Sequence, residues 1–204
     1  MNPLLQLKQQ GQQVWLDNLS RSLLREGSLQ RLISEDGLCG VTSNPAIFHK
    51  AIDGSPYYRE DLARLQARGL DAEACYEALV VADIREACDL LRPVYQQTKG
   101  EAGYVSLEVS PHLADDEEGS VQAARHLKQE VARDNLLIKI PATGAGLGAI
   151  ERLIAEGINV NVTLMFSLAH YNAVAGAYIR GAQRRMGGGG EPQQLRSVAS
   201  LFLS

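Results

Sequence analysis

The alternation of two kinds of segment most constrains how this 204-residue chain can fold. Short runs rich in β-branched and aliphatic residues alternate with longer segments in which apolar residues recur every three or four positions. The short runs predict strands at residues 14–19, 39–44, 104–109, 135–143, 158–164 and 197–204. Strands that alternate with helices pair in parallel through right-handed crossovers, so we expect an α/β protein.

The helical segments and their ends can also be placed. Apolar residues spaced as on one face of a helix predict helices within 72–98, 121–131 and 147–153. Helix C-termini favour glycine, and helix N-termini favour a hydroxyl side chain that accepts from a free backbone N–H. These preferences predict C-terminal positions at Gly37 and Gly157 and N-caps at Ser120 and Ser167.

The predicted strands carry polar residues on one face and apolar residues on the other. Asn161 and Thr163 flank Val162 in one strand, and Ser106 precedes Glu108 by two positions in another. Helix-covered parallel strands with one polar face are typical of a barrel with a functional interior, whereas an open doubly wound sheet buries both faces. We therefore predict a (βα)8 TIM barrel.

The number of strands indicates that the barrel is incomplete. A complete barrel has eight strands in about 250 residues, and only six strands are predicted here. We expect residues 1–204 to form a single barrel domain that lacks its C-terminal part. A homo-oligomer is one way in which the open edges of such a sheet could be covered.

Composition excludes several classes of protein. Hydrophobic residues make up 45% and charged residues 22% of the chain, which excludes wholesale disorder. The net charge of −4 gives no reason to expect nucleic acid or an acidic membrane as a partner. The chain has neither an apolar run of about 20 residues nor a signal peptide at its start. Three cysteines without metal-ligand spacing indicate reduced thiols and a cytoplasmic protein.

Lys139 is the most informative candidate for chemistry. It lies in the run LLIKIPAT between aliphatic residues, where a lysine is unusual. Desolvation favours the neutral amine, which can form a Schiff base with a carbonyl substrate. The alternative is a lysine at the end of a strand that reaches solvent or pairs with a carboxylate.

Two carboxylates occupy comparable positions, Asp17 in VWLDNL and Glu108 in VSLEVSP. On neighbouring barrel strands they can converge with Lys139 and act as proton donor and acceptor. Thr42 and Asn44 close the second strand, and Asn161 and Thr163 line the fifth, so their amides and hydroxyls could bind substrate or water. The alternative for the Asn44-Pro45 pair is turn chemistry.

A glycine pattern suggests a different function. Gly144, Gly146 and Ala149 follow a strand and open a helix, as in a dinucleotide-binding fold. That fingerprint also needs an acidic residue at the end of the next strand, and INVNVTL has none. We interpret the glycines as a tight strand-to-helix turn.

Five motifs together resemble one family. GVTSNPAIF, VSLEVSP, LLIKIPATGAG, GINVNVTLMFS and SVASLFLS, in this order, are similar to transaldolase in its long bacterial form. The resemblance extends from VWLDNLSR to the last residue. It implies a (βα)8 barrel of the class I aldolase type.

The resemblance also implies catalytic roles. Lys139 would form the Schiff base with a ketose phosphate, and Asp17 would handle the proton of the hydroxyl next to the cleaved carbon–carbon bond. Glu108 would act through a water when the imine forms and hydrolyses, and Thr163 would hold that water. By the same resemblance, residues that contact substrate are Thr42, Asn44, Asn161, Ser200 and Phe202.

The implied reaction belongs to the pentose phosphate pathway. A dihydroxyacetone unit moves from sedoheptulose 7-phosphate to glyceraldehyde 3-phosphate, which gives erythrose 4-phosphate and fructose 6-phosphate. No metal or cofactor is implied, because the protonated imine itself accepts the electrons. The alternatives are an aldolase that cleaves fructose 6-phosphate without transfer, and a non-catalytic fragment. Family members continue with a phosphate-binding arginine, so a protein that ends at Ser204 is expected to be inactive or barely active.

Overall fold

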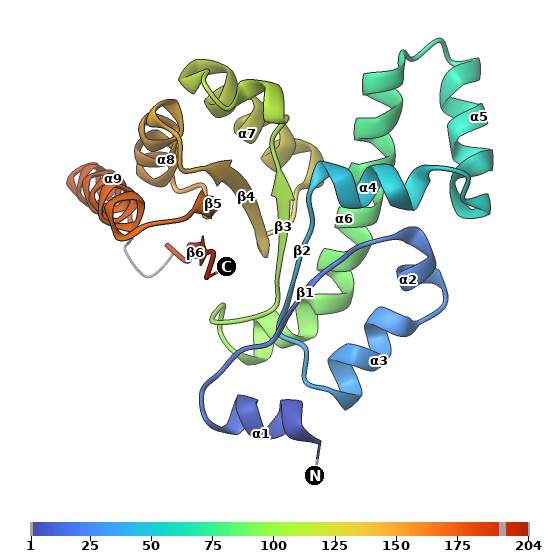
Figure 1. Ribbon diagram of the computed structural model, residues 1–204, viewed down its shortest axis with the longest axis horizontal. Coiled ribbons are helices and arrows are strands. Elements are labelled where there is room, and N and C mark those ends of the chain that lie inside the picture. The colour runs from blue at the N-terminus through green and yellow to red at the C-terminus, as the bar shows by residue number, and fades with distance from the viewer. Residues whose placement is uncertain (1, 192–194, 204) are drawn as a thin grey trace. The chain divides into compact units, whose positions relative to one another are not determined.

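The computed structural model describes residues 2–191 and 195–203. All predicted strand regions contain a strand in this described part (Figure 1). The last residue of the final predicted run, Ser204, lies outside it. The strands are β1 Trp15–Asp17, β2 Gly40–Thr42, β3 Tyr104–Glu108, β4 Leu136–Pro141, β5 Val160–Met165 and β6 Val198–Leu201.

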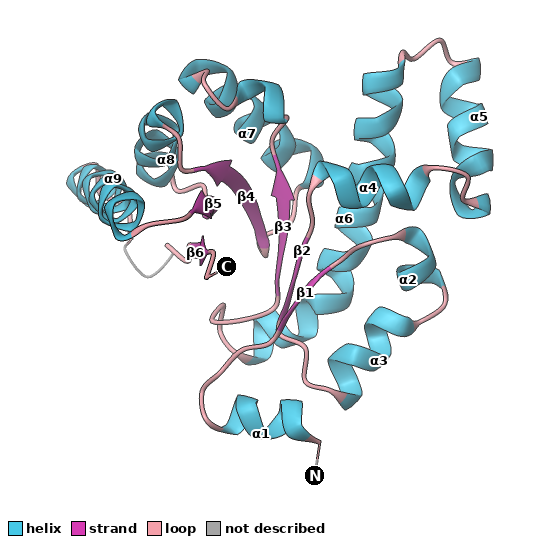
Figure 2. Ribbon diagram, viewed as in Figure 1, coloured by secondary structure: helices cyan, strands magenta, loops and turns pink. Residues whose placement is uncertain are grey.

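Helices occupy the segments between the strands (Figure 2). The three helices predicted from apolar spacing are present as α6 Ala72–Gln97, α7 Glu117–Val131 and α8 Gly144–Glu156. The others are α1 Pro3–Gln9, α2 Arg21–Arg25, α3 Ser28–Glu35, α4 Pro45–Ile52, α5 Arg59–Ala67 and α9 Leu168–Gly187, with short 3₁₀ turns η1 Pro56–Tyr58 and η2 Pro111–Leu113.

The order of the strands confirms the predicted fold class. They follow one another in the sheet in chain order, from β1 to β6, and helical segments follow β1 to β5. This is the arrangement of a (βα)8 TIM barrel, of which the described residues contain six strands. Two compact units make up the chain: Met1–Val105 with Val131–Asn135, and Ser106–Glu130 with Leu136–Ser204. The single-domain assignment stays a prediction.

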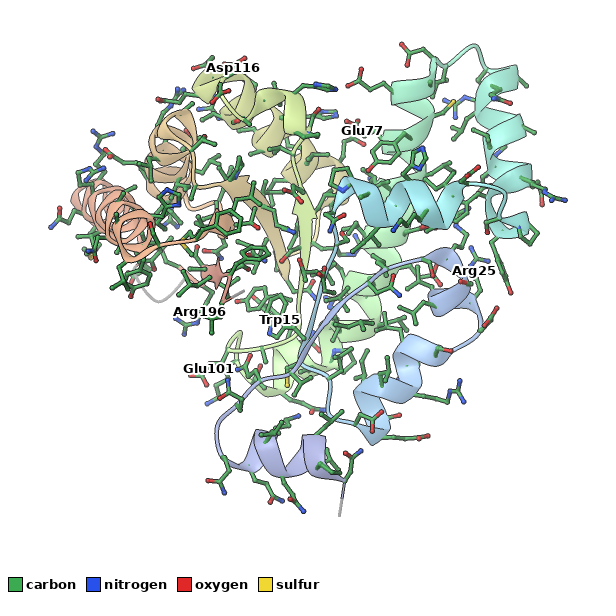
Figure 3. All side chains as sticks on the ribbon, viewed as in Figure 1. Trp15, Arg25, Glu77, Glu101, Asp116 and Arg196 are labelled. Carbon is green, nitrogen blue, oxygen red and sulfur yellow. The ribbon has the colours of Figure 1, made fainter. Side chains whose placement is uncertain are left out.

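In the first unit, β1 and β2 pair in parallel at close range. Trp15 is the register partner of Gly40, and Asp17 is the partner of Thr42. A Cβ at Gly40 would lie 2.5 Å from the indole of Trp15, the side chain labelled in Figure 3, so this ring needs a glycine at position 40. The core of this unit is made largely by the buried face of α6.

In the second unit, β4, β5 and β6 pair in parallel, and helices α8 and α9 pack against each other. The predicted strand-to-helix turn is confirmed, because β4 ends at Pro141 and α8 begins at Gly144, capped by the Thr143 hydroxyl. A Cβ at Gly146 would lie 1.9 Å from the carbonyl oxygen of Pro141, which explains the need for glycine there.

Strand β5 ends in an irregularity. Its register with β6 shifts between Val162 and Met165, and Leu164 has a left-handed φ of 60°. Exposed apolar side chains are frequent in this region: they include Leu164, Phe166, Leu168, Leu201, Phe202 and Leu203.

Three of the four predicted helix ends are confirmed. Gly37 and Gly157 have left-handed φ beyond α3 and α8, and the Ser167 hydroxyl accepts from the His170 N–H at the start of α9. The N-cap prediction for Ser120 is wrong. Helix α7 begins at Glu117, and the Ser120 hydroxyl donates instead to the Leu113 carbonyl oxygen at 3.0 Å.

All three cysteines are buried and unbridged. In the described part of the chain, no helix is both long and apolar enough to cross a membrane.

Candidate functional site

Lys139 and Glu108 form a largely buried ion pair. Every residue of β4 is buried, and the Lys139 side chain is 8% exposed, so this lysine does not extend into solvent. Its Nζ lies 3.3 Å from Oε2 of Glu108, at the end of β3, whose side chain is 17% exposed. The structure thus brings Lys139 and Glu108 together, as predicted for these two strands, and the ion pair equally matches the alternative of a lysine that pairs with a carboxylate.

Asn161 lies beside Lys139 on the same face of the sheet. The two residues are register partners in β4 and β5, and partners in a parallel ladder project to the same side. The Asn161 amide is 2% exposed and is held from two sides. Its Nδ2 donates to Ser106 Oγ, and its Oδ1 accepts from Ser200 Oγ, each at 2.9 Å. These two bonds fix the orientation of the amide.

Thr163 continues this polar face by one step. It is buried, it follows Asn161 by two positions, and its register partner is Pro141. The Ala142 N–H donates to the Thr163 carbonyl oxygen at 2.9 Å, which fixes the backbone there. Phe202 is 44% exposed, and its ring centroid lies 5.1 Å from that of Phe166.

The first unit holds the other candidate residues. Asp17 is exposed at the end of β1, beside Thr42 in the ladder. The Thr42 hydroxyl oxygen is buried, yet among the described residues it has no hydrogen-bond partner. Such an atom is suited to a ligand or a water. The Asn44 Oδ1 accepts from the Ile47 N–H at 2.9 Å and caps α4, so the turn-chemistry alternative holds for this oxygen.

The structure therefore assembles two groups of predicted residues. Lys139, Glu108, Asn161 and Ser200 lie together in the second unit, whereas Asp17 and Thr42 are paired in the first. The role of Ser106, which holds the Asn161 amide, was not predicted. Its position two residues before Glu108, on the polar face of β3, was the available signal. Within residues 2–191 and 195–203, no group of three His, Cys, Asp or Glu side chains could hold a metal ion.

The chemistry of the second group suits a carbonyl substrate. A desolvated primary amine can add to a carbonyl carbon, and a carboxylate in contact with it can accept and return the protons of that addition. The amide and the serine hydroxyls on the same face offer donors and acceptors for the hydroxyls of a polyol.

Comparisons with known proteins show the family of this chain. The family model described as transaldolase/fructose-6-phosphate aldolase matches residues 14–204. The chain is 53% identical over 204 residues to a transaldolase of Thiobacillus denitrificans, covering 100% of this chain and 57% of the relative. It is 50% identical to transaldolase 2 of a Nostoc species (100% and 54% covered) and 47% identical to a transaldolase of Neisseria gonorrhoeae (100% and 58% covered).

The chain thus spans somewhat more than half the length of these relatives. The family match begins at the first residue of the predicted β1 run and includes every candidate residue discussed above. The chain belongs to the transaldolase/fructose-6-phosphate aldolase family.

Proposed function

We propose that this protein is a transaldolase that works through a Schiff base on Lys139. The observation that carries the proposal is the buried contact between Lys139 Nζ and Glu108 Oε2 at 3.3 Å. A largely buried amine and carboxylate on two neighbouring apolar strands lose much of their hydration, and a role in chemistry would explain why they are retained there. The family membership makes carbonyl chemistry the most specific use.

The first stage is formation of the imine. The Lys139 amine adds to the C2 carbonyl of a ketose phosphate, and the resulting carbinolamine loses water to give a protonated imine. Glu108 takes the proton that the nitrogen releases and returns one to the departing hydroxyl, through a water that Thr163 holds. The same two residues act in reverse order when the imine is hydrolysed.

The second stage is cleavage and transfer. Asp17 accepts the proton of the C4 hydroxyl, the C3–C4 bond breaks, and its electron pair passes into the imine. With sedoheptulose 7-phosphate, erythrose 4-phosphate leaves, and a dihydroxyacetone unit stays on Lys139 as an enamine. This enamine then attacks the aldehyde of glyceraldehyde 3-phosphate, Asp17 returns the proton, and hydrolysis releases fructose 6-phosphate.

Polar side chains support the binding of the dihydroxyacetone portion. The fixed Asn161 amide, flanked by Ser106 and Ser200, lies on the same face as the imine. The Thr42 hydroxyl oxygen is without a partner in the described part of the protein, and the Asn44 Nδ2 group is the half of that amide not used for capping. We propose that these groups bind sugar hydroxyls and that Phe202 lines the distal part of the site. The proposed location is the cytoplasm.

The test is reductive trapping followed by intact mass and peptide mapping. After incubation with fructose 6-phosphate and borohydride, the wild-type protein should carry a reduced dihydroxyacetone adduct on Lys139. Lys139→Ala should lose the adduct, whereas a control variant at an exposed lysine, Lys50→Ala, should keep it. An adduct that persists in Lys139→Ala would place the nucleophile elsewhere.

The adduct mass also separates the roles of the two carboxylates. Asp17→Asn should still form the imine but should trap the whole sugar phosphate, because the C3–C4 bond is no longer cleaved. Glu108→Gln should slow both the appearance of the adduct and the hydrolysis of the imine. Equal slowing of imine formation and cleavage in Asp17→Asn would contradict its assigned role.

The name of the family also includes the second candidate function, fructose-6-phosphate aldolase. This activity would release glyceraldehyde 3-phosphate from fructose 6-phosphate without an acceptor aldehyde. Comparing product release with and without added erythrose 4-phosphate distinguishes it from transfer. A wild-type chain that forms no adduct would instead be a non-catalytic fragment.

A further inference from the structure

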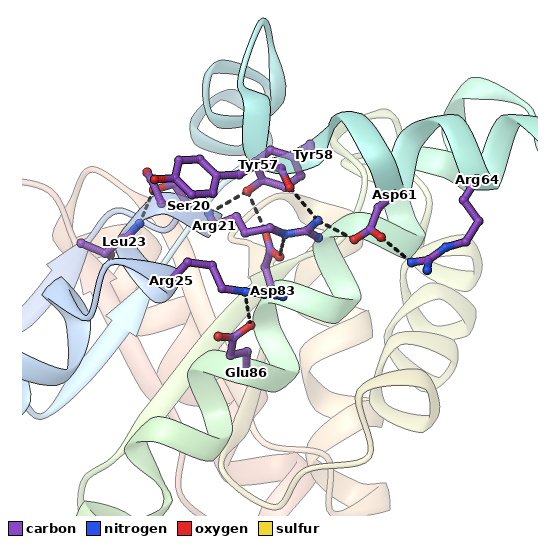
Figure 4. Close-up of polar contacts among 11 residues, drawn as sticks. Ser20, Arg21, Leu23, Arg25, Tyr57, Tyr58, Asp61, Arg64, Asp83 and Glu86 are labelled. Atoms are coloured by element: carbon purple, nitrogen blue, oxygen red, sulfur yellow. Dashed lines mark hydrogen bonds and ion pairs between the residues drawn. The ribbon is translucent and has the colours of Figure 1, made fainter.

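A largely buried polar cluster lies beside the start of α2, a few residues after β1 (Figure 4). We name Arg21, Tyr58, Asp61 and Asp83 the Arg21 cluster. The Arg21 Nε donates to Asp83 Oδ1 at 2.8 Å, and the Tyr58 hydroxyl donates to Asp83 Oδ2 at 2.6 Å. The Arg21 guanidinium also lies over the Tyr58 ring, 4.3 Å from its centroid. Arg21 is 4% exposed and Asp83 is 1% exposed.

The cluster joins segments that are distant in the sequence. The Arg21 Nη1 donates to Asp61 Oδ2 in α5 at 2.7 Å and to the Tyr57 carbonyl oxygen at 3.3 Å, while Asp83 belongs to α6. The backbone is held as well, because the Arg21 N–H donates to the Tyr58 hydroxyl at 2.9 Å. One residue at the first position of α2 is therefore fixed by its main chain and its side chain.

Stability alone does not account for such a cluster. Buried charges lose their hydration, and well-packed apolar residues of similar volume are often at least as stabilising. The planar guanidinium adds a fixed geometry, because a guanidinium with several fixed hydrogen-bond partners can occupy only one position. Burial raises the pKa of Tyr58, so its hydroxyl keeps the proton that it donates to Asp83.

The segment that the cluster fixes carries Asp17. Strand β1 ends at Asp17, and Arg21 follows four residues later. Between them, Leu19 is fully buried, and the Ser20 hydroxyl caps α2 by accepting from the Leu23 N–H at 3.2 Å. Before Asp17 the backbone is fixed by the ladder with β2. The exposed carboxylate thus stands on a short span anchored at both ends.

We propose that the Arg21 cluster positions Asp17 for proton transfer. Arg21, Tyr58 and Asp83 are positioning residues in this scheme and do not touch substrate. The inference rests on the proposed role of Asp17 as the acid and base of carbon–carbon cleavage. A displacement of about 1 Å in a catalytic group can cost on the order of 100-fold in rate.

The experiment uses Tyr58→Phe in the full chain. This change keeps the ring under the guanidinium but removes the acceptor of the Arg21 N–H and a donor to Asp83. The control is Asp89→Asn on α6, the helix that also carries Asp83, and it breaks an exposed ion pair with Arg133. Relative to this control, Tyr58→Phe should slow carbon–carbon cleavage about 10- to 100-fold. The rate of imine formation on Lys139 should stay within about twofold of the control. The trapped adduct should therefore shift from the dihydroxyacetone unit towards the whole sugar phosphate.

A second measurement does not depend on activity. Amide exchange, followed by NMR, should become faster across residues 17–20 in Tyr58→Phe and stay unchanged in Asp89→Asn. If the wild type forms no adduct at all, the proposed function fails, and amide exchange alone decides whether the cluster holds this segment. The proposal is overturned if residues 17–20 exchange as in the control, or if cleavage and imine formation fall by the same factor, as expected for a purely structural loss.

Discussion

Removal of Asp83 should destabilise the protein strongly, because its carboxylate is the most buried charged group of the Arg21 cluster. Breaking a buried ion pair from one side typically costs about 3–5 kcal/mol. Arg21 keeps Asp61 as a second partner, and that side chain is 31% exposed, which places the electrostatic loss near the lower limit. The Tyr58 hydroxyl would also lose its acceptor, for about 1–3 kcal/mol. We therefore expect Asp83→Ala to lower the free energy of unfolding by about 3–5 kcal/mol, since the two losses partly overlap.

The protein carries its own probe for this measurement. Its single tryptophan, Trp15, lies in β1 of the unit that contains the cluster. Urea unfolding followed by its fluorescence should show the loss, with thermal unfolding about 6–20 °C lower. Asp89→Ala serves as the control, because exposed ion pairs typically contribute only about 0–1 kcal/mol. If the two variants unfold within about 0.5 kcal/mol of each other, the guanidinium does not depend on Asp83, and the reasoning is refuted.

Two further predictions concern pH and the turn after β4. Hydrogen bonds from Arg133 outweigh the opposing effect of burial and lower the pKa of Asp89. The stabilisation from this pair is complete above the unfolded pKa of about 3.9 and is lost as the pH falls towards the lower native value. The free energy of unfolding in urea should therefore depend less on pH in Asp89→Asn than in the wild type between about pH 5 and pH 2. An equal dependence on pH in the two proteins would contradict the assignment. Gly146→Ala should destabilise by about 1–3 kcal/mol or more, because the new methyl group meets the Pro141 carbonyl oxygen. Gly144→Ala should be tolerated, because a Cβ there has no neighbour within 4 Å. Thermal unfolding followed by circular dichroism compares the two variants. Equal melting temperatures would contradict the prediction, because they would mean that the turn accommodates the methyl group at position 146 without cost.

Local patterns were sufficient to place the strands and the long helices. The runs around Lys139 and Asn161 are short and rich in β-forming residues, and the apolar spacing in 72–98 continues through most of α6. In these segments the local preferences of the sequence agree with the secondary structure that the tertiary contacts stabilise. The Ser120 prediction failed because capping depends on where the helix begins, and the Asp116 carboxylate already accepts from the Gly119 N–H at that end. Two good capping residues so close together cannot be ranked from the sequence.

The candidate site was predictable only in part. The contact between Lys139 and Glu108 follows from the way in which parallel strands align their ends, a rule that needs no coordinates. The partners of Arg21 do not follow from any such rule, because Asp83 is 62 positions away on a helix. The one sequence signal was an aspartate within the apolar run VVADI, and it indicates a buried partner without saying which.

The exposed apolar side chains at the ends of β5 and β6 affect how solution measurements on this protein should be read. They include Leu164 and Phe166 near β5, and Leu201 and Phe202 at β6. Exposed apolar patches favour association between chains. Mass action then links association to unfolding, so a protein that associates through this surface has a melting temperature that rises with concentration. A dilution series is therefore the reference against which each variant should be compared.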